Sequence, residues 1–312
     1  MTTLAAETVS LEIPYAMAAK ARLCAVSPPP QVDLVMAVHN DDGVLRESVS
    51  RLHRRLTLDF DLPVAITLVD LASDDHSARI AASLARELPG VRYLHTDQRG
   101  HGQALRAAWS SSAADIVGTI DVDLPVDLAH LREVLDPLLG GRTDIVVASR
   151  LAPGASVTAG PKHQVVARGY NALLGVVLGL GISDAGCPMM AARRGVIQTL
   201  LPFVEADGRF FETELLYLAQ RNGFAIREIS VHWTNDAVAA VELTRATIDD
   251  FRCVARLHRR AVRGQDRIRA LQSSPDPAGA ALVRLVGPPK VAQSRRDEHR
   301  TAERAPIVGA RR

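Results

Sequence analysis

Two carboxylates placed two residues apart are the residues of this sequence best suited to metal chemistry. An apolar, β-prone run over 116–120 ends directly before Asp121 and Asp123. Alternate residues share one face of an extended chain, so both carboxylates can point the same way. Two hard oxygen ligands at one point suit Mg²⁺ or Mn²⁺ held against a diphosphate. The alternative is a solvated turn after a strand, where Asp is common.

Other apolar runs end in polar residues in the same manner. Buried strands are predicted over 32–38, 64–69, 91–94 and 145–148, and helical patterns over 44–56, 77–88, 103–110 and 128–139 alternate with them. This alternation predicts an α/β fold, a mostly parallel central sheet with helices on both faces. Ligands of such sheets lie outside the carboxyl ends of the strands, where these residues fall: Asn40, Asp41, Asp70, Gly100, Gly102 and Arg150. The pattern therefore favours a nucleotide-type site.

The second half of the chain carries a different set of polar residues. A long loop over 151–162 precedes a predicted helix over 164–180 that contains Arg168. A further helix over 210–221 has Glu212 and Glu214 near its start, and the alternation over 225–233 predicts a strand. These residues add a cation and two carboxylates to the candidate chemistry.

The composition excludes several functional classes. The 312 residues are 47% hydrophobic with a formal net charge of +2, so we expect a globular protein that does not bind nucleic acid. The N-terminal region carries Glu7 and Glu12 and lacks the pattern of a signal peptide. The most apolar segment, 172–182, is shorter than the roughly 20 residues that a membrane span needs. We therefore expect a cytoplasmic protein that contacts a membrane only at its surface.

Four regions are predicted along the chain. Residues 1–30 form a flexible extension, 31–246 a single catalytic domain, 247–272 a basic helix and 273–312 a disordered tail. The arginines of the basic helix recur at three- and four-residue steps, which predicts one broad stripe: Arg252, Arg256, Arg259, Arg260, Arg263 and Arg267. The stripe fits an anionic membrane surface, and a solvated helix packed on the domain is the alternative.

These motifs together resemble a known family. From about Val32 to Arg260 the chain resembles the inverting GT-A glycosyltransferases of family 2 (nucleotide-diphospho-sugar transferase fold). It is most similar to the polyprenyl- and dolichyl-phosphate sugar synthases, particularly the dolichyl-phosphate β-glucosyltransferases. The stretches that carry the resemblance are VMAVHND (35–41), LVDLASDD (68–75), RGHGQALRAAW (99–109), DVDLPVDL (121–128), ASRLAPGASV (148–157), VVARGYNALL (165–174), SDAGCPMMAARR (183–194) and FFETELLYLAQRNGFAIREISVHW (210–233).

The resemblance implies a role for each candidate residue. It implies nucleotide-sugar binding by Ala37, His39, Asp41, Asp70, Gly100, Gly102, Asp121 and Arg150, with Asp70 reading the base or ribose. It implies that Asp121 and Asp123 hold Mg²⁺ or Mn²⁺, and that Asp123, Arg168, Glu212 and Glu214 serve catalysis. The glycines would let the backbone approach a ligand closely. Each residue also has a structural alternative: a cap or turn for Asp70, a solvated loop for His39, a simple turn for the glycines, surface ion pairs for the arginines and helix N-terminal stabilisation for Glu214.

The implied reaction moves a hexose, glucose from UDP-glucose with GDP-mannose as the alternative donor, onto a polyprenyl phosphate. The alternatives are transfer to a non-lipid hydroxyl acceptor and a degenerate nucleotide-sugar-binding protein with little activity. A nucleotidyltransferase fits the second half of the chain poorly. The chain departs from the family pattern at Leu71, Pro125 and Cys187-Pro188, and in the cation-poor segment 234–241. Leu71 and Pro125 fall on the donor side, and Cys187-Pro188 and the segment 234–241 fall on the acceptor side.

Overall fold

The computed structural model describes residues 31–158, 161–187, 189–234 and 248–268. The expected extension (1–30), the expected disordered tail (273–312) and all but Thr234 of the cation-poor segment lie outside the described residues. Pro188 also lies outside them.

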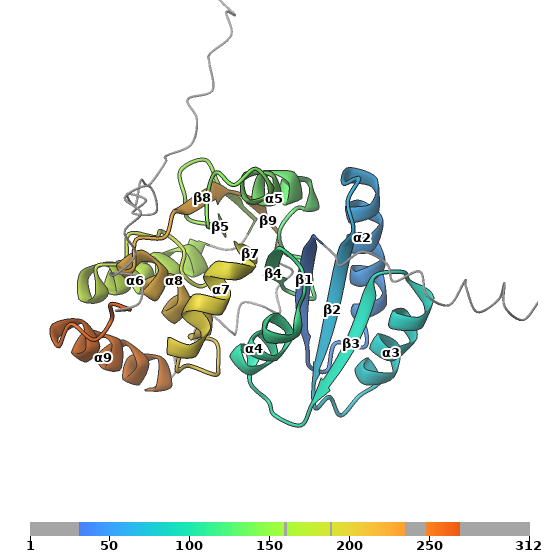
Figure 1. The fold of residues 1–312 in the computed structure, drawn as a ribbon, viewed down its shortest axis with the longest axis horizontal. Coiled ribbons are helices and arrows are strands. Elements are labelled where there is room, and N and C mark those ends of the chain that lie inside the picture. Colours follow the sequence, from blue (N-terminus) through green and yellow to red (C-terminus); the bar gives the residue numbers. More distant parts are fainter. Residues whose placement is uncertain (1–30, 159–160, 188, 235–247, 269–312) are drawn as a thin grey trace, which may run out of the picture.

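A seven-stranded sheet forms the centre of the molecule, in the order β3-β2-β1-β4-β7-β5-β8 (Figure 1). Neighbouring strands are parallel except at β7, which is antiparallel to both β4 and β5. The predicted mostly parallel sheet is therefore confirmed. The strands are β1 (Val32–Val38), β2 (Val64–Leu71), β3 (Val91–Thr96), β4 (Ile116–Ile120), β5 (Ile145–Ser149), β7 (Met189–Arg193) and β8 (Ile226–Ser230).

The central strands are apolar because helices cover both of their faces. Nearly every residue of β1, β2, β4 and β5 is buried, as parallel strands between two helical layers require. Helices α2 and α3 lie on one side of β1–β3 and α4 lies on the other (Figure 1). The bounds are α2 (Leu45–Asp59), α3 (Ser77–Glu87), α4 (His101–Ser111), η2 (Leu128–His130), α5 (Leu131–Leu139), α6 (Pro161–Leu178), α7 (Arg194–Leu200), η3 (Leu201–Phe203) and α8 (Phe211–Arg221).

Strand β7 occupies the middle of the sheet although it comes late in the chain. The sequence shows it only as a short apolar segment. Gly118 of β4 lies against it, and a Cβ at Gly118 would come within 2.7 Å of the Met190 carbonyl oxygen. The glycine therefore lets β4 and β7 approach each other, which joins the two halves of the fold.

The predicted strand over 225–233 is divided in the structure. β8 ends at Ser230, and His232–Trp233 form β9, which pairs in parallel with β6 (Ser156–Val157). At the break, the Val231 N–H donates to the Ser149 carbonyl at 3.2 Å. The predicted long loop after β5 therefore contains a short strand of a second, small sheet.

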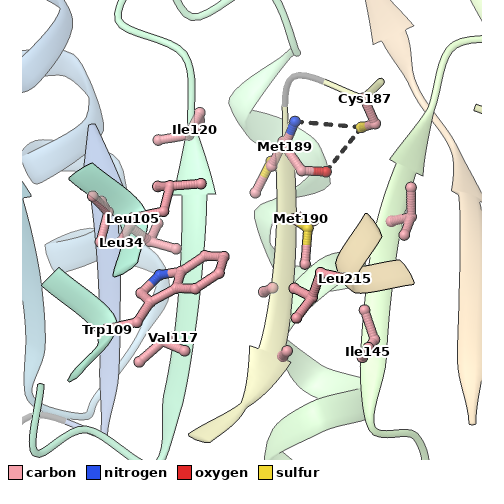
Figure 2. Close-up of a cluster of buried hydrophobic side chains, with 14 of the residues drawn as sticks. Leu34, Leu105, Trp109, Val117, Ile120, Ile145, Cys187, Met189, Met190 and Leu215 are labelled. Carbon is pink, nitrogen blue, oxygen red and sulfur yellow. Dashed lines mark hydrogen bonds between the residues drawn. The ribbon is translucent and has the colours of Figure 1, made fainter. Parts of the chain in front are cut away.

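Part of the core surrounds Trp109, which lies near Val117, and Met190, which lies near Leu215 (Figure 2). Trp109 of α4 is fully buried, and its indole N–H donates to the Gly118 carbonyl at 3.2 Å. Cys187 is buried beside β7, where its thiol contacts the Met189 carbonyl at 2.9 Å (Figure 2). Burial raises the pKa of this thiol well above its usual range, as expected for a structural cysteine.

The basic helix is shorter than the prediction of 247–272. α9 spans Ile248–Val262, and Gly264 then turns the chain with a φ of +63°. The turn buries Asp266 against α8, where it accepts hydrogen bonds from the Tyr217 hydroxyl at 2.8 Å and from Arg221 Nε at 2.5 Å. Gly264 thus ends the helix as a left-handed glycine commonly does, and the chain after it packs against α8 through Asp266.

The predicted single arginine stripe is wrong in part. Arg256 and Arg260 point inward and pair with Glu205 and Glu214. The outward arginines are Arg252, Arg259, Arg263 and Arg267. In the part of the chain that the structure describes, no helix is both long and apolar enough to cross a membrane.

Candidate functional site

The carboxyl edge of the sheet brings acidic residues of two strand ends together. Asp41 follows β1 and Asp123 follows β4, and the two strands are neighbours. Burial raises the pKa of Asp41, and the nearby charge of Asp123 raises it further, although a hydrogen bond from the His39 N–H opposes the shift. The two carboxylates therefore lie near each other at the ends of neighbouring strands.

Asp121 lies at the centre of this acidic group. It immediately follows β4, and its carbonyl accepts a hydrogen bond from the Leu124 N–H at 3.1 Å, which closes a tight turn with Leu124 at a φ of +47°. Burial raises the pKa of Asp121 to about 7, and the charges of Asp123 and Glu212 contribute in the same direction. Asp121 therefore lies close enough to Asp123 of the turn and to Glu212 of α8 for both charges to oppose its ionisation.

The first turns of α4 and α8 also contribute side chains to the site. His101 opens α4 and Glu212 lies in the first turn of α8, and His101 Nε2 lies 3.0 Å from Glu212 Oε1. Burial lowers the pKa of His101, but the charge and hydrogen bond of Glu212 outweigh it, so the pKa is raised overall. The positive charge of Arg209 lowers the pKa of both Asp121 and His101. The site thus contains cationic groups as well as carboxylates.

Sequence reasoning missed His101 and Arg209. The signal for His101 was its place between the two glycines of RGHGQ, where the glycines alone drew attention. Arg209 stands three residues before Glu212, and no pattern in the sequence distinguishes it from other arginines. Tertiary contact between α4 and the start of α8 makes both residues part of the site.

The glycines of this motif serve the packing of the protein itself. A Cβ at Gly102 would lie 2.6 Å from Phe211 Cβ, and one at Gly100 would lie 2.8 Å from the Asp207 carbonyl oxygen. The expected part of these glycines in nucleotide-sugar binding stays a prediction. Their small size lets residues 207–211 approach α4, which places His101 against Glu212.

The carboxylates at the end of β4 fit a divalent cation that is bound by protein and phosphate oxygens together. Asp121 and Asp123 offer hard oxygen ligands at the end of β4. Among the described residues, no three His, Cys, Asp or Glu side chains form a group able to hold a metal ion. Mg²⁺ is commonly held by one or two carboxylates together with substrate phosphates. The pair therefore suits a cation that arrives with a diphosphate.

The β1 and β2 ends form the region expected to hold the nucleotide. Ala37 is half-buried near the end of β1, and His39 is exposed with its Nδ1 2.9 Å from the Leu71 carbonyl oxygen. Asp70 is buried, and its carboxylate lies 2.7 Å from His95 Nδ1. The contact raises the pKa of His95. Asp70 thus has a protein partner, and its role toward a base or ribose stays a prediction.

Arg150 is held by the protein at the end of β5. Its guanidinium contacts both oxygens of buried Asp184, at 2.8 and 2.9 Å, and donates to the Gly186 carbonyl at 2.7 Å. The same group stacks over the Trp233 ring. These contacts organise the turn 184–187, and phosphate binding by Arg150 stays a prediction.

Arg168 and Glu214 take no part in the contacts that surround Asp121. Arg168 is exposed on α6 and lines a pocket of about 240 Å³ with Leu151, Asn171, Ala172, Ile182 and Ser183. Glu214 is fully buried and pairs with Arg256 at 2.6 Å, while also accepting from the Ala206 N–H at 2.8 Å. Of the four residues expected to serve catalysis, the structure brings Asp123 and Glu212 together around Asp121. The part expected of Arg168 and Glu214 stays a prediction.

Three curated relatives share this sequence pattern. A glycosyltransferase named AglD of Haloferax volcanii is 31% identical over 69% of this chain and 35% of its own length. Polyprenol monophosphomannose synthase of Mycolicibacterium smegmatis is 26% identical over 72% of this chain and 84% of its own. Human dolichyl-phosphate β-glucosyltransferase is 23% identical, with coverages of 67% and 68%. The chain thus spans about a third of AglD and most of the mannose synthase.

Solved structures confirm the expected GT-A fold. Glucosyl-3-phosphoglycerate synthase of Mycobacterium tuberculosis, solved with Mn²⁺, uridine diphosphate and glucosyl-3-phosphoglycerate, superposes with a TM-score of 0.52. The two chains are 21% identical, and the match covers 76% of this chain and 83% of that one. The family profile described as glycosyl transferase family 2 matches residues 33–201. With its sheet, its acidic carboxyl edge and this match over more than half of its length, the chain belongs to glycosyl transferase family 2.

Proposed function

We propose that this protein is an inverting glycosyltransferase that moves a hexose, glucose from UDP-glucose, onto a polyprenyl phosphate. The observation that carries the proposal is the group of carboxylates at the carboxyl edge, where Asp41, Asp121, Asp123 and Glu212 influence one another. The names of the mannose synthase and of the dolichyl-phosphate glucosyltransferase support a lipid-phosphate acceptor.

The donor side follows from the chemistry of the leaving group. Asp121 and Asp123 would hold Mg²⁺ or Mn²⁺, which supplies charge neutralisation for the departing diphosphate when bound. Asp41, His39 and Ala37 line the neighbouring end of β1, where they would orient the nucleotide. The Mn²⁺ and uridine diphosphate of the superposed synthase support this arrangement, and GDP-mannose is the alternative donor.

The acceptor side needs a cation more than a base. A lipid phosphate is largely ionised at neutral pH, since a second phosphate pKa is about 6. It can attack the sugar carbon without giving up a proton to the enzyme. Arg168 is exposed beside the pocket between α6 and residues 182–183, where its guanidinium would hold phosphate oxygens.

A donor panel with Mg²⁺ or Mn²⁺ and a short-chain polyprenyl phosphate tests the proposal, with released nucleoside diphosphate as the signal. We expect release from UDP-glucose that depends on the acceptor and falls at least about 100-fold in Asp123→Asn. Asp115→Asn is the matched control, because Asp115 is exposed directly before the same strand. Release of pyrophosphate, or no release with any donor, would contradict the proposal.

A second candidate is transfer to a non-lipid hydroxyl acceptor. The contact between His101 and Glu212 favours it, because an alcohol must lose a proton as it attacks and Glu212 lies beside Asp121. A panel of sugar and polyol acceptors, run with the same donors, separates the two candidates.

A further inference from the structure

Helices α6 and α9 lie side by side at the end of the molecule away from β1–β3 (Figure 1). The His258 Nδ1–H donates to the Val177 carbonyl at 3.0 Å. Val177 lies near the end of α6 and His258 lies in the second half of α9. The hydrogen bond therefore holds these two parts of the helices against each other.

The outer side of α6 is apolar and exposed. Val176 is 87% exposed and Val165 is 69% exposed, and Ala172 and Leu173 are also exposed. At 3.6 residues per turn these four side chains lie within about 100° of the helix circumference. Exposed Arg168 borders them on one edge. The described part of α6 thus has a solvent-facing apolar stripe in place of the polar surface that a globular protein normally presents.

The neighbouring helix α9 also has exposed apolar residues on its outer side. Phe251 is 55% exposed and Val262 is 74% exposed, and Ala255 lies between them on the same side. Three exposed arginines lie along one edge of these apolar residues: Arg252 and Arg259 on α9, and Arg263 directly after it. Arg252 pairs with Asp249 at 2.8 Å, whereas Arg259 and Arg263 have no carboxylate within ion-pair distance among the described residues. The inward pairing of Arg256 and Arg260 to Glu214 holds α9 in this orientation.

We infer that this α6–α9 face docks on an anionic membrane surface. An apolar strip flanked by arginines on both edges matches the boundary between acyl chains and negatively charged headgroups. Ala172 belongs both to the strip and to the pocket lined by Arg168. A lipid phosphate at that surface would therefore lie beside the pocket. The inference deepens the proposed function, because it states how a membrane-embedded acceptor reaches the enzyme.

Flotation with lipid vesicles tests the α6–α9 face. We expect the full chain to float with vesicles of phosphatidylcholine that contain about 30% phosphatidylglycerol, and much less with phosphatidylcholine alone. Arg259→Gln with Arg263→Gln should weaken binding about 25-fold, at about fivefold for each arginine. Val176→Glu should weaken it about tenfold or more. The matched controls lie on α2, where Arg51, Arg54 and Leu58 are also exposed: Arg51→Gln with Arg54→Gln, and Leu58→Glu.

Three outcomes would overturn the inference. The first is that the wild type does not float with anionic vesicles. The second is that the α2 controls lose as much vesicle binding as the α6 and α9 variants. The third is that light scattering shows a wild-type dimer that Val176→Glu converts to a monomer. The last outcome would make the face an interface between two copies. Vesicle binding is independent of catalysis, so it can succeed while the proposed function fails. Conversely, the protein could transfer sugar to a detergent-dispersed acceptor without binding vesicles. That result would support the proposed function and contradict membrane docking by the α6–α9 face.

Discussion

Glu212 is the residue that the two candidate acceptors would need differently, because only a hydroxyl acceptor requires a base. Its carboxylate contacts His101 and its charge raises the pKa of Asp121, so under the second candidate function it is the group proposed to take the proton of an acceptor hydroxyl. Glu214, two residues later, points to the other side of α8 and is held by Arg256. Two acidic residues that look equivalent in the sequence therefore have different surroundings.

We predict that Glu212→Gln distinguishes a base from a positioning group. Gln keeps an oxygen that can accept from His101 but cannot take a proton. Transfer to polyprenyl phosphate should fall less than about tenfold, and transfer to a hydroxyl acceptor should fall by about 10²- to 10⁴-fold. The ratio of kcat/KM values for the two acceptors measures this. Glu47→Gln, on exposed α2 surface, is the control, and equal losses with both acceptors would contradict the role of a base.

At the scale of elements, the approach of α8 to α4 assembles the mixed acidic and cationic wall. Phe211 at the start of α8 packs tilted against Trp109 of α4, with ring centroids 5.7 Å apart. The Gln103 N–H donates to the Asp207 carbonyl at 3.2 Å, which ties the segment before α8 to α4. Because Gly102 leaves room for Phe211, the geometry of His101 and Glu212 depends on this one contact.

Gly102→Ala should disturb both stability and activity. The added methyl group would lie 2.6 Å from Phe211 Cβ, so α8 must move. We expect a loss of about 1–3 kcal/mol in the free energy of unfolding, measured in urea, and reduced donor turnover. Gly195→Ala is the control, because a Cβ there meets nothing within 4 Å. Unchanged stability in Gly102→Ala would show that the α4–α8 contact is looser than the structure indicates.

The contact between α8 and α9 depends on a buried carboxylate. Glu214→Gln should lower the free energy of unfolding by about 3 kcal/mol, the lower end for a broken buried pair, because the side chain of Arg256 keeps 28% exposure. Glu205→Gln removes an exposed partner of the same arginines and should cost at most about 1 kcal/mol. Urea unfolding measures both, and equal effects would contradict a dominant role for Glu214.

At the scale of the whole molecule, the two halves of the sheet are joined by β7. The β1–β4 half carries Asp41, Asp121 and Asp123, and the second half carries Arg150 and the turn 184–187. Because β7 runs antiparallel between β4 and β5, residues near its start lie at the same edge as the ends of those strands. The polar residues of the two halves thereby meet at one edge of the sheet.

We predict that a divalent cation stabilises the protein only together with its donor. Two carboxylates are a weak site alone, and diphosphate oxygens would supply further ligands. Mn²⁺ alone should hardly change the Tm, and Mn²⁺ with UDP at about 100 times its Kd should raise the Tm by about 5 °C or more. Thermal unfolding of wild type and Asp123→Asn measures this, without any need for turnover. A large shift with Mn²⁺ alone would instead indicate a resident metal site.

Local patterns were sufficient for most of the first half of the chain. The apolar runs predicted β1, β2 and β4 to within about two residues, because buried parallel strands must be apolar along their whole length. The period-2 rule placed Asp121 and Asp123 together, and the parallel topology placed Asp41 beside them. These inferences depend on neighbouring residues or on a general rule of sheets, both of which a sequence displays.

Contacts between distant segments could not be predicted in this way. No local signal shows that Gly102 makes room for Phe211, or that Asp266, after the turn at Gly264, reaches Tyr217. The arginine stripe illustrates the same point, because helical spacing alone cannot tell which arginines turn inward to a buried carboxylate.

The sequence by itself therefore determined the type of sheet, the pair of carboxylates that we propose binds a metal, and the family likeness. Only the tertiary structure decided that His101 joins Glu212, that Glu214 holds α9 and that α6 and α9 share an exposed apolar side. The reason is physical: periodicity records which side of an element is apolar, while the free energy of packing between elements selects which sides meet.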